Sequence, residues 1–159
     1  MLRQKSKCLV ANYHFSIDGL ALVAATAKTV IELGSGSADR VKIKEWWVEF
    51  DGVTSSAVPG KVEVGRFSAA VTTATTGTPS KDDPADGTAG AVVKHSTTVE
   101  GAGTAEAGID IHRISPNGGG YTYPAPLGDE YTLALSTFWR IRCTFAAGVN
   151  VTAGVKWSE

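Results

Sequence analysis

The segment Lys42–Gly52, KIKEWWVEFDG, decides the fold of this chain. Apolar and polar residues alternate along it, as is typical of a β-strand, yet Trp46 and Trp47 stand side by side. Neighbouring side chains of a strand point to opposite faces of the sheet. Only one of the two indoles can therefore face the core of this chain.

Two registers are open for this strand. Without interruption, each face switches halfway between charged and apolar side chains. With a β-bulge near Glu45, one face collects the apolar side chains and the other collects all the charges. We favour the bulge, because β-bulges are common and a single one separates the apolar from the charged side chains along the whole segment. The core face then reads Val41, Ile43, Trp46, Val48 and Phe50, and the outer face reads Lys42, Lys44, Glu45, Trp47 and Glu49.

The bulge register leaves Trp47 among charges on the outer face. A tryptophan side chain buries on the order of 200 Å² when it is covered. At about 25 cal/mol per Å², full exposure would forfeit several kcal/mol. We therefore expect Trp47 to be covered, either by the long segment Thr72–Gly90, rich in Thr, Gly, Pro and Asp, or by a neighbouring subunit.

The rest of the chain reads as short strands separated by turns, without a convincing long helix. Tyr121–Leu127 is an aromatic segment whose two prolines assign it to an edge or a loop. Phe138–Ala147 and Val149–Trp157 each carry one apolar face and predict a C-terminal hairpin. The pattern predicts an all-β fold, an antiparallel, jelly-roll-like β-sandwich of eight to nine strands that forms a single domain over residues 11–159.

Residues 1–10, MLRQKSKCLV, form a basic N-terminal extension. One interpretation is an arm that is flexible or contacts a lattice, and the other is an over-long start with Val10 as the natural first residue. Of the two cysteines, Cys8 lies in this extension and Cys143 in a strand pattern, so we expect both to be unpaired.

Charge and motifs exclude several classes of function. With 15 basic and 16 acidic residues, the net charge of -1 provides no field that would hold nucleic acid. The longest apolar run, Leu20–Ala25, is too short to cross a membrane. His14, His95 and His112 lack metal-like spacing, and no nucleophile–base pair is visible. We expect no cofactor, no metal and no enzymatic activity.

Aromatic and arginine side chains that are expected to point outward indicate protein contacts. On the C-terminal strand, the face opposite Trp139 carries Phe138 beside two arginines, although Phe138 could equally cap the core at the end of its strand. The tyrosines at 121, 123 and 131 could form a platform for a sugar. The candidates for a partner interface are Trp47, Phe138, Arg140, Arg142, Tyr121 and Tyr123.

Four stretches together resemble small virion structural proteins of tailed bacteriophages, most of all those of phages of actinobacteria. They are KIKEWWVEFDGVTSSAVPGKVEVGRF, TTGTPSKDDPAD, YPAPLGDEYTL and RIRCTFAAGVNVTAGVKWSE. The resemblance covers residues from about 10 to 159 and includes no site motif.

The resemblance implies a non-enzymatic virion protein, made in the host cytoplasm and located on the capsid surface. Its expected role is capsid decoration (cement) or minor capsid protein, and its expected partners are further copies of itself, as a trimer, and the major capsid protein. The alternative is a tail-associated or carbohydrate-binding β-sandwich module.

Overall fold

The computed structural model describes residues 10–37, 40–53, 58–100 and 110–159 of the chain. These residues form strands and loops, and none of their segments is a helix that could span a membrane. The strands are β1 (Asn12–Leu22), β2 (Lys28–Gly34), β3 (Val41–Asp51), β4 (Gly60–Phe67), β5 (Thr73–Gly77), β6 (Ser80–Lys81), β7 (Val92–Val99), β8 (Asp110–Ile114), β9 (Asn117–Pro124), β10 (Tyr131–Leu133), β11 (Phe138–Thr144) and β12 (Val149–Ser158).

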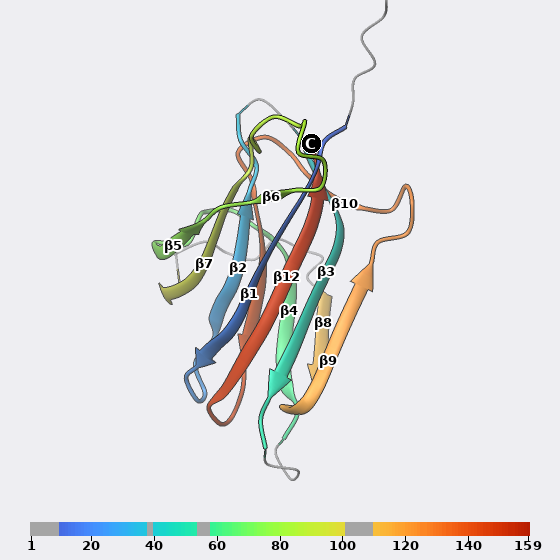
Figure 1. The fold of residues 1–159 in the computed structure, drawn as a ribbon. Coiled ribbons are helices and arrows are strands. Elements are labelled where there is room, and N and C mark those ends of the chain that lie inside the picture. The colour runs from blue at the N-terminus through green and yellow to red at the C-terminus, as the bar shows by residue number, and fades with distance from the viewer. Residues whose placement is uncertain (1–9, 38–39, 54–57, 101–109) are drawn as a thin grey trace, which may run out of the picture.

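The strands form two antiparallel sheets packed face to face (Figure 1). The first sheet has the order β10-β3-β12-β1-β6, with β9 also paired to β3, and the second has the order β5-β7-β2-β11-β4-β8. Four antiparallel pairs, β1/β12, β2/β11, β3/β9 and β4/β8, alternate between the two sheets. This winding is that of a jelly roll, so the predicted fold class is confirmed.

The structure contains more strands than the eight to nine that the sequence predicts. Over the described residues there are twelve, of which eight form the four pairs of the jelly roll. The segment 72–90 is not one long loop, because β5 pairs with β7 and β6 pairs with β1. The short β10 is a separate addition to β3.

The predicted C-terminal hairpin is wrong. β11 lies between β2 and β4 in the second sheet, whereas β12 lies between β3 and β1 in the first. The connection at 145–148 therefore crosses from one sheet to the other (Figure 1). The two apolar faces meet across the core, where a hairpin would have placed them side by side.

The predicted bulge in β3 is confirmed. Lys156 of β12 lies opposite Glu45, but the next residue, Trp157, lies opposite Ile43, so Lys44 is the extra residue. All five side chains expected on the core face are buried: Val41, Ile43, Trp46, Val48 and Phe50. The strand therefore adopts the register that keeps its charged side chains out of the core.

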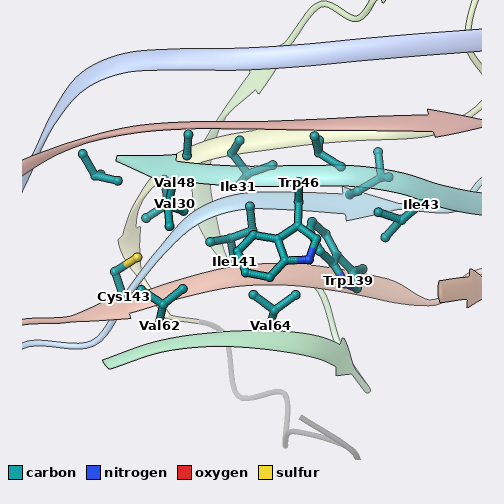
Figure 2. Close-up of a cluster of buried hydrophobic side chains, with 14 of the residues drawn as sticks. Val30, Ile31, Ile43, Trp46, Val48, Val62, Val64, Trp139, Ile141 and Cys143 are labelled. Atoms are coloured by element: carbon teal, nitrogen blue, oxygen red, sulfur yellow. The ribbon is translucent and has the colours of Figure 1, made fainter. Parts of the chain in front are cut away.

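The core lies between the sheets and is built around large side chains from both (Figure 2). Trp46 from β3 is 1% exposed, and Trp139 from β11 is fully buried. Within the described residues neither indole Nε1 has a hydrogen-bond partner. The two indoles therefore contribute through apolar burial and close packing.

Substitution of the two neighbouring tryptophans separates their roles. Trp46→Ala removes a buried indole and should lower the free energy of unfolding by about 3–5 kcal/mol. Trp47→Ala removes a half-buried side chain on the outer face and should lower it by about 1 kcal/mol. Urea denaturation followed by circular dichroism measures both, and equal losses would show that the bulge does not divide the two residues in this way.

Candidate functional site

Trp47 lies on the outer face of the first sheet and is half-buried. Gly154 of β12 is its cross-strand neighbour, and a Cβ atom on Gly154 would lie only 2.0 Å from Trp47 Cζ2. The indole therefore rests on bare backbone that only glycine leaves free. Lys156 Nζ lies 5.9 Å from the indole centroid, within the range of a cation–π contact.

The cover expected from the segment Thr72–Gly90 is wrong. This segment runs along β1, where the Asp82 N–H donates to the Asn12 carbonyl (3.0 Å) and the Tyr13 hydroxyl donates to the Gly87 carbonyl (3.1 Å). In the first sheet, β1 is separated from the strand of Trp47 by β12. The bare backbone of Gly154 supplies the cover that was expected from the loop. Further cover by a neighbouring subunit stays a prediction.

Arg140 is not exposed for contact with a partner, which corrects the prediction from the sequence. Its side chain lies on the outer face of the second sheet but is fully buried. Arg140 Nε donates to Glu32 Oε2 at 2.7 Å, and Glu32 is itself 1% exposed. A buried charge requires a partner of opposite sign, and the neighbouring strand β2 supplies one.

The connection from β4 to β5 covers this ion pair. Arg140 Nη2 donates to the Ala69 carbonyl, and the Val71 N–H donates to Glu32 Oε2 at 2.8 Å. The guanidinium also lies 4.5 Å from the centroid of the buried Phe67 ring. Side chains on the outer face of the second sheet are thus buried beneath the β4–β5 connection. The alternation of side chains along a single strand does not predict this burial.

Arg142 continues this arrangement toward solvent. Its Nε lies 3.1 Å from Glu63 Oε2, and Lys61 Nζ lies 3.1 Å from the other carboxylate oxygen. Burial raises the pKa of the Glu63 carboxyl, but hydrogen bonds from Arg142 and Lys61 outweigh burial and hold this pKa below its usual value. Arg142 remains partly exposed, and its role in an interface stays a prediction.

Phe138 begins β11 and is half-buried on the outer face of the second sheet. A Cβ atom on Gly34 would lie 3.2 Å from the Phe138 ring, so the ring rests on this glycine of the adjacent β2. Trp139 takes the inward position. Phe138 therefore covers sheet backbone from outside, and its role in an interface stays a prediction.

The predicted tyrosines lie at the side of the sandwich where β9 and β8 face each other. The Tyr121 ring lies 4.3 Å from the His112 ring and 5.2 Å from the Trp46 ring, measured between centroids. Tyr123 stacks on Trp46 at 6.1 Å and 25°, and Tyr131 follows at 6.2 Å from Tyr123. The three tyrosine rings therefore form one row. Tyr121 and Tyr123 are half-buried, and their contacts with Trp46 fix them against the core.

One exposed apolar surface was missed by the sequence interpretation. Val53 is 92% exposed, Val58 68% and Val23 64%. Val23 follows β1, Val53 follows β3 and Val58 precedes β4, and these strand ends lie at the lower end of the molecule in Figure 1. A hollow of about 650 Å³ at this end is lined by Val53, Val58, Phe145 and Val149, among others. The only signal in the sequence is valine in turn segments, which becomes informative once topology brings the loops together. We call Val23, Val53 and Val58 with this hollow the apolar end.

The described residues hold no group of three or more His, Cys, Asp or Glu side chains arranged to bind a metal ion. His14 Nδ1 lies 2.8 Å from Asp82 Oδ1, an exposed pair that attaches β6 to β1. Cys143 is a free, buried thiol whose pKa is raised by burial, so it is a poor nucleophile. Residues 1–9 of the basic extension, which include Cys8, lie outside the described residues.

The fold defines the chain as an antiparallel β-sandwich of jelly-roll topology. No protein-family model matches the chain, and neither does any curated protein or solved structure.

The buried ion pair can be tested by removing one charge and then both. Arg140→Met leaves the Glu32 carboxylate buried without its partner and should lower the free energy of unfolding by about 3–5 kcal/mol. Adding Glu32→Leu should recover most of this loss. Arg142→Met is the control, and because its pair with Glu63 is partly exposed, we expect a loss of about 1 kcal/mol or less. Urea denaturation of the four proteins would contradict the assignment if Arg140→Met cost no more than Arg142→Met.

Proposed function

We propose that this chain is a non-enzymatic structural protein of a tailed-bacteriophage virion, a capsid decoration or minor capsid protein. In this proposal it self-associates as a trimer and binds the major capsid protein on the capsid surface. The four stretches that resemble such proteins support the assignment, as does the double-sheet jelly roll, an architecture of viral capsid and lectin domains. Because a fold alone does not define a function, the proposal depends on the surface of the molecule.

The apolar end is the observation that carries the proposal. Single exposed apolar residues are normal on a soluble protein, but exposed apolar residues that share a hollow are typical of a contact surface. Val53 and Val58 border the same hollow. Complete burial of one valine is worth about 1.5 kcal/mol or more. Covering both in each subunit would stabilise an assembly considerably.

The distribution of charge favours contact through this end. The outer face of β3 carries exposed Lys42, Lys44 and Glu49, and charged side chains are depleted in the centre of protein interfaces. In a cyclic trimer, identical loops of the three subunits meet only where they lie at the symmetry axis, and the proposal places the apolar end there. A trimer joined at its apolar ends would leave the charged sheet faces toward solvent. Binding of the trimer to the lattice of the major capsid protein would involve three subunits at once, and this multivalency would strengthen contacts that are weak singly.

Self-association can be tested with a single charge placed at the apolar end. Val53→Asp should convert the trimer into monomers, because the carboxylate would lose its hydration in the interface. Leu127→Asp is the matched control, since Leu127 is 99% exposed on the β9–β10 loop, away from the apolar end. Size-exclusion chromatography with light scattering measures the mass of each protein. A wild-type monomer at high concentration, or equal dissociation by both variants, would contradict this role of the apolar end.

The location in the particle needs a separate test. Heads and tails of gradient-purified phage, separated and probed with an antibody against this chain, should show the protein on heads. Detection on tails alone would contradict the capsid assignment and favour the tail-associated alternative.

A further inference from the structure

A second hollow, of about 410 Å³, lies beside β9 and β10. Its aromatic lining comes from Tyr123 and Tyr131. Their ring centroids are 6.2 Å apart and their planes are inclined by 53°. Trp46 stacks behind Tyr123 at 25°, so the core fixes the position of this ring. The volume lies in the range of small-molecule sites, about 300–1,000 Å³.

Polar side chains from four different segments complete the lining. Arg66 comes from β4, Asp110 from the start of β8, Asp129 and Glu130 from the β9–β10 loop, and Thr132 from β10. The guanidinium donates hydrogen bonds, the carboxylates accept them, and the threonine hydroxyl does both. The hollow can therefore satisfy a ligand that is rich in both donors and acceptors.

The β9–β10 loop is held in shape before any ligand binds. The Ala125 N–H donates to the Lys44 carbonyl at 2.7 Å, and the Asp129 N–H donates to the Pro126 carbonyl at 2.9 Å. Gly128 takes a φ of +92°, and its N–H donates to the Glu130 carboxylate at 3.1 Å. Hydrogen bonds from the backbone N–H groups of Glu130 and Gly128 lower the pKa of the Glu130 carboxyl. A rigid loop of this kind reduces the ordering cost of binding.

The charges around the hollow are close to balance. The three carboxylates of the lining are opposed by Arg66 and by the fields of Lys42 and Lys44, which act on Glu130. A cationic peptide would meet the repulsion of these basic groups, and an anion would meet the carboxylates. Two aromatic rings with balanced donors and acceptors suit a neutral ligand with apolar C–H faces and many hydroxyl groups.

We infer that the hollow between Tyr123, Tyr131 and the β9–β10 loop is a binding site for a neutral carbohydrate. The tyrosine rings contact the C–H faces of the sugar, and Arg66, Asp129 and Glu130 bind its hydroxyl groups. The inference is independent of the proposed virion role, since this side of the sandwich is distinct from the apolar end. Tyr121, the third ring of the row, packs on His112 and does not line the hollow.

The test uses the full chain and a panel of neutral oligosaccharides built from glucose, galactose, mannose and arabinose. The panel is first screened as a glycan array to find the saccharide that binds most tightly. This saccharide is then titrated into isotope-labelled protein, and binding is followed by NMR. The backbone resonances of Tyr123, Tyr131 and Thr132 should shift with a single saturating curve. Tyr123→Ala and Tyr131→Ala should each weaken binding by roughly tenfold, the factor that corresponds to 1.4 kcal/mol.

Two exposed positions keep the test independent of folding. Asp129→Asn, which changes an exposed carboxylate of the lining, should weaken binding severalfold and leave the unfolding midpoint unchanged. Leu127→Ala is the matched control on the same loop, since Leu127 does not line the hollow, and it should keep wild-type affinity. The inference is overturned if no saccharide of the panel shifts these resonances at millimolar concentration. Affinity unaffected by Asp129→Asn and Tyr131→Ala, or tighter binding of a tri-lysine peptide than of every saccharide, would overturn it equally.

Discussion

The arrangement of this molecule depends on one extra residue, Lys44, in the strand β3. Without it, the segment after Ile43 would present the charged side chains of Glu45 and Glu49 to the core, and burial of a charge is costly. With it, Trp46 points inward and β3 keeps one apolar face through its whole length. β3 lies beside β12 near the centre of the first sheet, so its register determines what the second sheet packs against.

The same bulge divides the outer edge of β3 into two halves. β10 pairs with β3 before the bulge and β9 pairs with it after the bulge, while the Lys44 carbonyl accepts a hydrogen bond from Ala125 between them. The β9–β10 loop starts from this point, and the tyrosine-lined hollow forms beside it. The β-bulge, which places the charged side chains of β3 outside the core, thus also shapes the surface at one side of the sandwich. The apolar end arises separately, from loops that the jelly roll gathers at one end.

The sequence is informative where a side-chain pattern has a single physical solution. Two registers are open for the strand around Trp46 and Trp47, but only the bulge keeps every charged side chain on the outer face, and the structure has that bulge. It is less informative where the same pattern suits two arrangements, because an apolar face on each of β11 and β12 fits a hairpin and a pair of facing strands equally well. Contacts between distant segments are also hidden. The buried pair of Arg140 with Glu32, the glycine beneath Trp47 and the polar lining around Tyr131 all require the fold before they can be recognised.

The most direct test of this account is the solvent accessibility of each tryptophan. ¹⁹F NMR of protein labelled with 5-fluorotryptophan resolves the four indoles, and single Trp→Phe variants assign them. Trp46, Trp139 and Trp157 are at most 1% exposed, whereas Trp47 is half-buried. We predict that a soluble paramagnetic agent broadens the Trp47 resonance alone. Broadening of the Trp46 resonance, or equal protection of the two neighbours, would contradict the bulge as the feature that divides them.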